Sequence, residues 1–324
     1  MNVSPNRKSW ITTEQWSFLH EALAASSALS AANKLGVLAR LDAGPADVMT
    51  LAHDCAISER GARLLLAALC SLGLIEEGAN GLYDAALPNL VQMTMWVTPW
   101  EQLTGVIRIG QPERAGDSAV GASILYPDVI AHLGSWFALA AERAADYLIT
   151  RGQCVLDLGI GAAPWSLALS GRNSDIRVTG VDVPSVLEVT RQVVANRGYA
   201  DRFDYLSGDL FTIDLDRSAY DLAIAGNLCH LFDEPSNRHL LARLFNALRP
   251  GGTLAILDAL PNERLDGPRS AMLYALGLLL HTNRGQVYPF STYFGWLREV
   301  GYEAIECVDL STTPQFSLIM AKRP

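Results

Sequence analysis

The sequence predicts an α/β protein in which a mainly helical N-terminal region precedes a largely parallel β-sheet covered by helices. Residues 10–150 contain long stretches rich in Ala and Leu with few helix breakers. From Gln153 onward, short apolar strands alternate with helices, a pattern typical of a parallel sheet covered on both faces. Near the C-terminus two strands are separated only by a turn, and such strands pair antiparallel. We therefore expect two domains, over residues 1–150 and 151–324.

The N-terminal region is expected to combine helices with a short β-hairpin. The stretch Glu14–Leu41 predicts a long helix that ends before a Gly-Pro pair. A further helix is expected over Ser58–Leu72, where Ser58 is a suitable N-cap. Leu74–Glu76 and Leu82–Tyr83 then flank a glycine-containing turn, as the strands of a hairpin do. Helices followed by a hairpin are typical of a winged helix.

The second region is expected to contain five strands that pair in parallel, with helices between them. The expected strands are Cys154–Leu158, Arg177–Val181, Phe203–Leu206, Tyr220–Ala225 and Thr253–Asp258. The expected helices are Pro164–Ser170, Ser185–Arg197 and Ser236–Leu248. The closing antiparallel pair is expected over Ala304–Val308 and Phe316–Met320.

Composition and charge exclude several classes of protein. The chain has 324 residues and a net charge of −9, which argues against non-specific binding to nucleic acid. The N-terminus lacks the apolar stretch of a signal peptide, and the longest apolar run, near Met272–Leu280, is too short to span a bilayer. The five cysteines form no CxxC pair, which fits free thiols in a reducing compartment. We therefore expect a cytoplasmic protein without a nucleic-acid or membrane partner.

The first expected strand runs into a turn that contains two glycines, Gly159 and Gly161, shortly after Asp157. Glycine allows the backbone to approach a ligand closely, and open parallel sheets bind ligands at the carboxyl ends of their strands. By itself, such a turn fits NAD sites, other nucleotide sites and ordinary turns.

Two aspartates end the next two strands. Asp182 ends the second strand, where a carboxylate can accept both hydroxyls of a ribose, or can cap the helix that follows. Asp209 follows the third strand, where it can contact an adenine edge with Leu210 or Phe211 against the ring, or can simply be a turn residue.

Taken together, these residues resemble the class I S-adenosylmethionine (SAM)-dependent methyltransferases. The resemblance rests on Asp157-x-Gly159-x-Gly161, Asp182, Gly208-Asp209 and the turn Pro250-Gly251-Gly252 before a strand. It implies a Rossmann-like sheet with SAM as cofactor, although Ala163 replaces the third glycine of the family pattern. A NAD-dependent oxidoreductase is disfavoured because its fingerprint needs a glycine where this chain has Pro164. The resemblance implies that SAM is bound by Asp157, Gly159, Gly161, Asp182, Val183, Asp209, Leu210, Phe211 and Asn227.

Motifs in the N-terminal half narrow the family. Ala31-Ala32-x-x-Leu35-Gly36-Val37, Leu51-Ala52 and Leu72-Gly73-Leu74-Ile75 resemble small-molecule O-methyltransferases of the acetylserotonin, plant phenolic and bacterial polyketide-tailoring type. This resemblance implies a homodimeric enzyme of secondary metabolism, whose N-terminal region joins two chains and helps close the substrate pocket. A non-catalytic regulator that binds DNA would need a basic helix, whereas Ser58–Leu72 carries only two arginines beside a glutamate.

His230 is the candidate general base. The catalytic histidine of the family follows the fourth strand, and His230 holds that position. An imidazole can take a proton from a phenol or enol near neutral pH, and Asp233 or Glu234 can support it. The alternatives are a histidine that caps the next helix and one that only orients the acceptor. We expect methyl transfer to a hydroxyl of an aromatic or polyketide-like natural product.

A second histidine, His281, points to an alternative chemistry. It falls in the segment that lines the substrate site of the family, and some relatives use two histidines and a metal to C-methylate α-keto acids. A metal on His230 and His281 would stabilise an enolate, but no third protein ligand is identifiable, so no metal is the main expectation. The acceptor atom, O, C or N, is left open. The residues expected to contact the substrate are Trp96, Trp100, Met272, Leu276 and His281.

Overall fold

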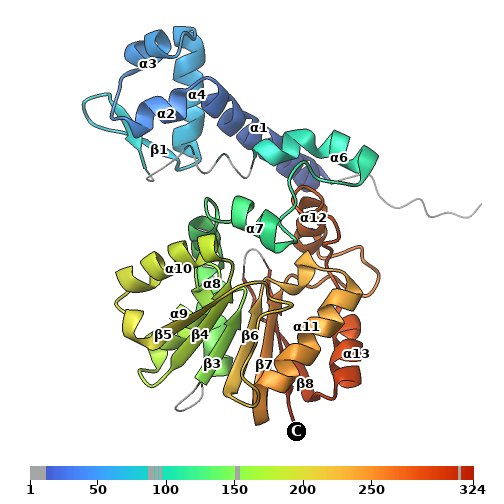
Figure 1. The fold of residues 1–324 in the computed structure, drawn as a ribbon. Helices are drawn as coiled ribbons and strands as arrows, with labels where there is room; N and C mark the ends of the chain where they lie inside the picture. Colours follow the sequence, from blue (N-terminus) through green and yellow to red (C-terminus); the bar gives the residue numbers. More distant parts are fainter. Residues whose placement is uncertain (1–11, 87–90, 92–93, 95–96, 150–153, 313–314) are drawn as a thin grey trace, which may run out of the picture. The chain divides into compact units, whose positions relative to one another are not determined.

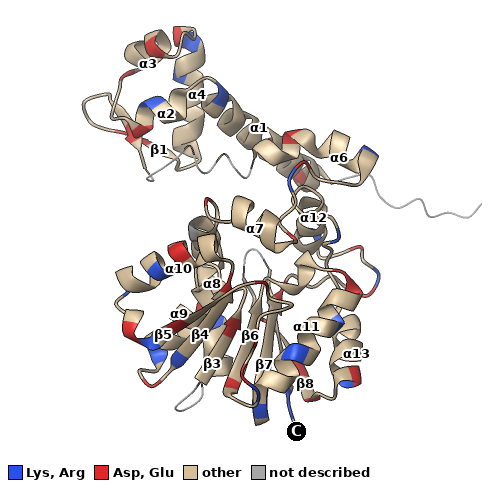
Figure 2. Cartoon of the chain, in the orientation of Figure 1, with Lys and Arg blue, Asp and Glu red and all other residues tan. Residues whose placement is uncertain are grey.

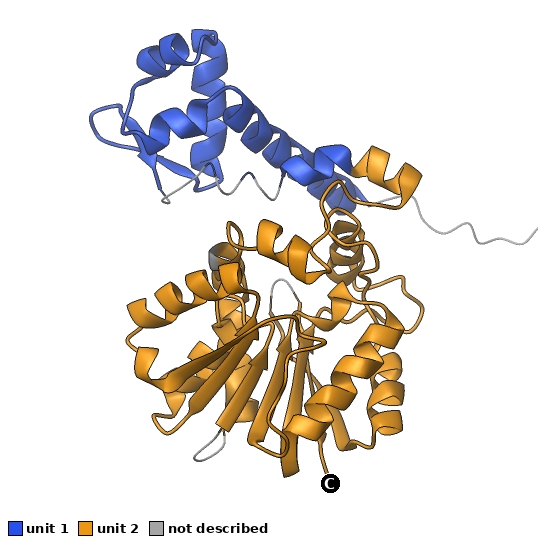
Figure 3. Cartoon of the chain, in the orientation of Figure 1, with its two compact units in different colours: residues 1–102 blue, residues 103–324 orange. Residues whose placement is uncertain are grey.

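The computed structural model describes residues 12–324, apart from residues 87–90, 92–93, 95–96, 150–153 and 313–314 (Figure 1). The chain forms two compact units, Met1–Gln102 and Leu103–Pro324 (Figure 3). The helices between residues 103 and 148 thus belong to the same compact unit as the sheet. The domain boundary at residue 150, expected from the point where strands begin, stays a prediction.

The first unit consists of helices and a short hairpin. Its elements are α1 (Thr13–Lys34), α2 (Val37–Asp42), α3 (Val48–Asp54), α4 (Glu59–Ser71), β1 (Ile75–Glu77), β2 (Tyr83–Ala85) and the 3₁₀ helix η2 (Thr98–Gln102). The strands β1 and β2 pair antiparallel, which confirms the expected hairpin. The single long helix expected over Glu14–Leu41 is instead divided, because Gly36 takes a left-handed conformation with φ 76° between α1 and α2.

Local capping explains where the helices of this unit begin. Thr12 and Gln15 form a capping box at the start of α1, and the Ser58 hydroxyl accepts the Gly61 N–H at the start of α4. Buried side chains of α2, α3 and α4 then share one small core with the hairpin. This unit carries both acidic and basic residues (Figure 2), and on α4 Arg63 pairs with Glu59 at 2.7 Å. The description of this unit as a winged helix stays a prediction.

The second unit is built on a sheet whose strands run in the order β5-β4-β3-β6-β7-β9-β8. The strands β3 to β7 pair in parallel, and β9 pairs antiparallel with both β7 and β8. This topology confirms the expected α/β fold with an antiparallel closing pair. The strand bounds are β3 (Cys154–Leu158), β4 (Arg177–Asp182), β5 (Phe203–Ser207), β6 (Tyr220–Gly226), β7 (Leu248–Asp258), β8 (Glu303–Asp309) and β9 (Ser317–Lys322).

Helices cover both faces of this sheet (Figure 1). The helices of this unit are α6 (Leu103–Ile109), α7 (Ala119–Leu125), α8 (Ile130–Leu148), α9 (Pro164–Arg172), α10 (Pro184–Asn196), α11 (Glu234–Ala247), α12 (Arg269–Leu278) and α13 (Phe290–Val300), with short 3₁₀ helices η3 (Ala200–Arg202) and η4 (Cys229–Leu231). Among the described residues, no helix is long and apolar enough to cross a membrane.

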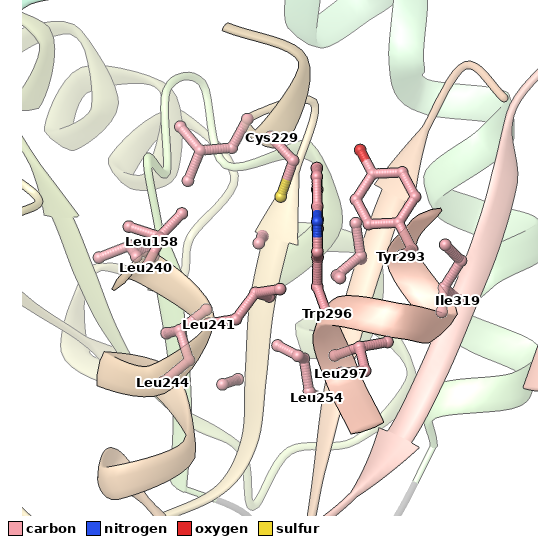
Figure 4. Packing of buried hydrophobic residues seen from close by; sticks show 14 of the residues in the cluster. Leu158, Cys229, Leu240, Leu241, Leu244, Leu254, Tyr293, Trp296, Leu297 and Ile319 are labelled. Atoms are coloured by element: carbon pink, nitrogen blue, oxygen red, sulfur yellow. The ribbon is translucent and has the colours of Figure 1, made fainter. Parts of the chain in front are cut away.

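Alternation along β3 divides the core of this unit into two layers. Leu156 and Leu158 join the cluster formed with α11 and α13, whereas Val155 packs with α8 and α9 on the other face. Figure 4 shows the first cluster, where Leu241 of α11 and Trp296 of α13 meet over the sheet. Truncating a buried leucine in such a core costs about 2–5 kcal/mol. The packing therefore holds the strand ends rigidly in place.

The connections of the sheet create one place suited to a ligand. The chain passes from β3 outward to β4 and β5, then returns to the other side of β3 to form β6 and β7. Helices therefore leave the sheet in opposite directions on the two sides of the β3–β6 pair, and a ligand site is expected at this switch point. The carboxyl ends of the parallel strands carry Asp182 and Asp258, and Asp157 lies one residue before the end of β3.

Candidate active site

The turn after β3 depends on its two glycines. Gly159 and Gly161 have positive φ angles of 71° and 51°, which residues with a side chain rarely adopt. A Cβ atom at Gly159 would also lie 2.8 Å from the Leu228 side chain. Ala163, which replaces the third glycine, takes a left-handed conformation at φ 58° and caps α9 at its start. The turn is thus compact and presents backbone at the ends of β3 and β4.

Asp157 is a buried carboxylate with one unused oxygen. Its side chain is buried on the face of β3 that packs against α9, where it accepts the Ser166 hydroxyl. The second oxygen, Oδ1, has no hydrogen-bond partner in the described structure. Burial raises the pKa of Asp157 to about 7, although the bond from Ser166 acts in the opposite direction. A cationic or hydrogen-bonding ligand would complete this site.

Asp182 binds the glycine turn. Its Oδ2 accepts the Gly161 N–H at 3.1 Å and its Oδ1 accepts the Val183 N–H at 2.8 Å. Burial raises the pKa of Asp182 to about 6, and these two N–H groups partly oppose the shift. The N-cap of α10 is Val183, and no side chain caps that helix, so Asp182 does not serve as its capping residue. Each carboxylate oxygen keeps a lone pair for a ligand hydroxyl.

Asp209 lies in a turn after β5, and its Oδ1 accepts the Phe211 N–H at 2.8 Å. The turn role considered from the sequence is therefore present. Phe211 packs edge-on against Phe232 with ring centroids 4.9 Å apart, and Leu210 packs partly buried against the same core cluster. A contact of these side chains with an adenine ring stays a prediction.

Asn227 follows β6 directly and takes a strained backbone conformation, with φ 53°. Its N–H donates to the Leu257 carbonyl at 2.7 Å, which fixes the strand end. Neither Oδ1 nor Nδ2 of its buried amide makes a hydrogen bond of normal geometry. Leaving a buried polar group unpaired costs about 1–3 kcal/mol, so this amide is poised to gain stability from a polar ligand.

His230 lies in η4 and is held by Asp258. His230 Nδ1 lies 2.6 Å from Asp258 Oδ1, and both side chains are almost completely buried. The carboxylate also accepts the His230 N–H, the Ala259 N–H and the Tyr293 hydroxyl. A carboxylate that already accepts three donors only accepts hydrogen bonds, so Nδ1 must donate at 2.6 Å, which leaves Nε2 as the hydrogen-bond acceptor of the neutral ring.

Tyr274 of α12 forms a hydrogen bond with that second nitrogen. Its hydroxyl lies 3.0 Å from His230 Nε2, and the two rings meet edge-on with centroids 5.1 Å apart. Burial raises the pKa of Tyr274 well above its ordinary value, and Asp258 adds to the shift. The phenol is thus a hydrogen-bond donor to His230 at neutral pH.

The two acids considered as supports of His230 have other partners. The Asp233 carboxylate accepts the Ser236 N–H at the start of α11 and pairs with Arg284 at 2.9 Å. Glu234 pairs with Arg238 at 2.7 Å. The supporting acid is instead Asp258, and the helix cap is Asp233 and not His230. The signal for Asp258 was present in the sequence, because it ends a strand as Asp182 does.

Comparisons with known proteins show which proteins the chain is similar to. A family model described as a methyltransferase domain matches residues 155–252. The 3-hydroxy-5-methyl-1-naphthoate 3-O-methyltransferase of Streptomyces sahachiroi is 28% identical over 300 residues, which are 86% of this chain and 86% of that protein. The tetracenomycin polyketide synthesis 8-O-methyl transferase of Streptomyces glaucescens is 25% identical over 309 residues, which are 88% and 90% of the two chains.

A solved structure shows the same fold. Human N-acetylserotonin methyltransferase in complex with SAM matches with a TM-score of 0.77 and 21% identity, over 98% of this chain and 99% of that chain. The chain is a class I SAM-dependent methyltransferase. It is similar to O-methyltransferases over most of its length, as the sequence motifs predicted, and SAM is its cofactor.

Side chains of this methyltransferase could hold SAM at the switch point. Asp157 offers a free oxygen for a cation, Asp182 keeps lone pairs for ribose hydroxyls, and Asn227 offers an unpaired amide. SAM carries a sulfonium and an ammonium group, a ribose and an adenine, so each of these side chains has a matching group on the cofactor. The residues present therefore fit the cofactor.

His281 of the methyltransferase follows α12. Burial lowers its pKa to about 4, and His230 adds to the shift, so the imidazole is neutral at physiological pH. The loop before α7 holds this segment: Gly116 N–H donates to the His281 carbonyl at 2.7 Å, and Asp117 accepts the backbone N–H groups of Asn283 and Arg284. His281 is thus a neutral polar group near His230, and its ring also interacts with the backbone of Gly277.

A metal site on the two histidines of the methyltransferase has little support. Among the described residues, no group of three His, Cys, Asp or Glu side chains is arranged to hold a metal. Both nitrogens of His230 already have partners, Asp258 and Tyr274. A metal on His230 and His281 would require Tyr274 to leave, so this alternative stays an untested prediction.

The substrate residues expected from the sequence are only partly brought together. Ala271, Tyr274 and Leu278 share the inward face of α12, whereas Met272 and Leu276 lie on its flank and are partly buried. Trp100 belongs to the other compact unit, and Trp96 lies outside the described residues. Their contact with the substrate stays a prediction. The sequence reasoning missed Tyr274, although its helical spacing from Ala271 and Leu278 marks it as inward-facing.

Proposed function

We propose that this methyltransferase transfers a methyl group to a hydroxyl of an aromatic or polyketide-like small molecule. The observation that supports this most strongly is the buried pair of His230 and Asp258, which lies at the same strand ends as the cofactor-binding turn. A hydroxyl must lose its proton when it is methylated, and a held imidazole is suited to receive it. The relatives named above as O-methyltransferases agree with a hydroxyl acceptor.

We further propose the residues that bind the cofactor. When bound, SAM supplies an electrophilic methyl group on a sulfonium. Asp157 and Asn227 are proposed to hold its amino acid end, and Asp182 its ribose hydroxyls. Gly159, Gly161 and Val183 present backbone at the turn, and Asp209, Leu210 and Phe211 are proposed to contact the adenine. The unpaired atoms of Asp157 and Asn227 support this placement.

In the proposed mechanism His230 is the final proton acceptor. Asp258 accepts a hydrogen bond from Nδ1–H, so the imidazole ring presents Nε2 as its basic atom and is kept from flipping. When Nε2 gains a proton, the imidazolium stays 2.6 Å from the carboxylate, which stabilises the positive charge in a buried site. His230 is thus both oriented and electrostatically supported by one residue.

The pocket chemistry favours a neutral acceptor over an α-keto acid. A carboxylate substrate would need a buried cation, and two arginines that could hold a carboxylate, Arg108 and Arg284, are exposed. Arg284 is already paired with Asp233, and Arg108 lies on an exposed face of α6. Neither arginine is therefore placed to bind a substrate carboxylate, and a phenolic hydroxyl is the better match.

We propose that the methyltransferase is a homodimer joined through its first unit. Trp16, Leu19 and Leu23 follow helical spacing along α1 and expose 64%, 50% and 68% of their surface. A contiguous apolar stripe of this kind is typical of a protein interface. A second copy of the same helix would cover it.

Turnover of a defined acceptor tests the proposed function. The purified full chain is incubated with SAM and a panel of hydroxynaphthalenes and hydroxyanthraquinones, each paired with its O-methyl ether. We expect the free hydroxyl compounds, and not the ethers, to gain one methyl group by mass spectrometry. His230→Ala should lower kcat at least about tenfold, because general base catalysis contributes about 10²–10⁴-fold.

Calorimetry distinguishes loss of catalysis from loss of binding. The affinity for SAM should be nearly unchanged in His230→Ala, because His230 is proposed to receive the acceptor proton and not to bind the cofactor. Methylation of the ethers, or of carbon in the same compounds, would contradict hydroxyl transfer. Unchanged turnover in His230→Ala would contradict the base role.

A further inference from the structure

Tyr274 lies between His230 and the rest of the pocket. The basic atom of His230, Nε2, already receives the Tyr274 hydroxyl at 3.0 Å, and the imidazole is only 3% exposed. Its other nitrogen is held by Asp258. An acceptor hydroxyl therefore cannot reach the base while Tyr274 keeps this position.

Two residues with unpaired buried polar atoms lie near Tyr274. The Tyr126 hydroxyl and both polar atoms of the Asn227 amide are buried and make no hydrogen bond of normal geometry. Both residues lie close enough to Tyr274 to change the pKa of its hydroxyl. Buried polar atoms are normally paired. The Asn227 amide is proposed to hold the amino acid end of the cofactor, so the unpaired Tyr126 hydroxyl is the group that supports an acceptor near Tyr274.

We propose that Tyr274 is a catalytic residue that carries the proton from the acceptor to His230, an inference that rests on the proposed function. The acceptor O–H bond breaks as its proton moves to the Tyr274 oxygen, while the Tyr274 proton moves to His230 Nε2. The acceptor oxygen would form its bond to the methyl carbon as the bond from that carbon to the sulfonium sulfur breaks, and the electron pair of the broken bond would stay on sulfur. Tyr274 is neutral before and after, and His230 gains one proton, which it later returns to solvent.

The alternative is that Tyr274 only donates a hydrogen bond to His230 Nε2 while no acceptor is bound. The acceptor would then displace the phenol and contact Nε2 directly. The two arrangements differ in one consequence, since removal of the hydroxyl abolishes a relay but leaves a directly contacted base intact or more accessible.

The test compares Tyr274→Phe with a matched control in the full-length protein. Tyr274→Phe keeps the ring that packs edge-on against His230 and removes only the hydroxyl. Tyr302→Phe removes another buried hydroxyl, which takes no part in the proposed site. That hydroxyl donates to the Leu241 carbonyl, and the two oxygens lie 3.2 Å apart. Thermal unfolding should show that both variants fold.

Acceptor acidity provides a readout that a structural role would not change. The acceptors are 2-naphthol and a nitro-substituted naphthol that is ionised at the assay pH. We expect Tyr274→Phe to lower kcat on 2-naphthol at least about tenfold, and to have little effect on the ionised naphthol, which has no proton to lose. Combining it with His230→Gln should add little further loss, because both variants interrupt one path.

Nitrogen NMR of histidine-labelled protein reads the contact without turnover. The Nε2 signal of His230 should shift in Tyr274→Phe and stay unchanged in Tyr302→Phe. A wild-type kcat for Tyr274→Phe on 2-naphthol, or an equal loss on both naphthols, would overturn the relay alone. If wild-type protein methylates neither naphthol nor any other hydroxyl compound, the proposed function fails. An Nε2 signal that does not shift in Tyr274→Phe would show that the hydrogen bond on which the relay depends is absent.

Discussion

The Asp258 carboxylate lies 2.6 Å from His230 Nδ1 and fixes which nitrogen of the imidazole is basic. The two residues come from the end of β7 and from the 3₁₀ turn after β6, and these strands are neighbours in the sheet. The strand pairing therefore builds the dyad. Predictions about the base follow from this contact, and others follow from the glycine turn and from α1.

Asp258→Asn should lower kcat by about 10²-fold or more, because the ring loses the anion that selects its tautomer and stabilises its charge. The affinity for SAM should change little. The matched control is Asp233→Asn, which keeps a good helix N-cap on α11 and should leave kcat within about twofold. If Asp233→Asn proved to be the damaging variant, the support of His230 would lie where the sequence first placed it.

SAM affinity should fall as the pH falls. The pKa of Asp157 is about 7 and that of Asp182 about 6 in the free protein, so both carboxylates gain protons in this range. Only the ionised forms suit a cationic amino acid end and a pair of ribose hydroxyls. Calorimetry should show affinity falling by up to about tenfold per pH unit and per group below these values. Asp157→Asn should bind weakly and show a flatter profile.

The stability of the free protein should have the opposite pH dependence. Because folding raises the pKa of Asp157 from about 4 to about 7, its contribution to stability is complete below about pH 4 and is lost as the pH rises through about 7. The thermal shift produced by SAM should therefore grow between about pH 5.5 and pH 8. A SAM-induced shift that is independent of pH would contradict the role of Asp157.

Gly159→Ala should destabilise the protein and weaken SAM binding. The substitution forces a side chain to adopt φ 71° and places its Cβ atom 2.8 Å from Leu228. Gly198→Ala is the control, since Gly198 has φ 76° but open space around its Cβ position. Urea unfolding should show a loss of about 1–2 kcal/mol for the control and a larger loss for Gly159→Ala. Equal losses of stability in the two variants would mean that the Leu228 side chain moves away from the new Cβ atom at little cost.

Leu23→Glu should dissociate the proposed dimer. A charge in the centre of the apolar stripe on α1 would be buried at an interface, which is costly. Light scattering should change from the mass of two chains to that of one. Glu21→Lys, on the opposite side of α1, alters the charge without touching the stripe and should leave the mass unchanged. A wild-type protein that is already monomeric would refute this prediction.

The sequence predicted most of the second unit because its signals are local. Alternating strands and helices, Pro164 at the start of α9 and the short turn before β9 each act over a few residues. The sheet order and the antiparallel closing pair confirm that reading. The first unit was predicted less well, since Gly36 divides one expected helix into α1 and α2. A single glycine in an Ala-rich stretch is compatible with either outcome.

By itself, the sequence determined the fold, the cofactor and the position of His230, because strand ends and glycine turns are read from neighbouring residues. The partners of His230 were decided only by the tertiary structure. Asp258 and Tyr274 lie 28 and 44 residues further along the chain. Their contacts depend on the pairing of β6 with β7 and on which face of α12 packs inward, and these are properties of the folded sheet and not of any short segment.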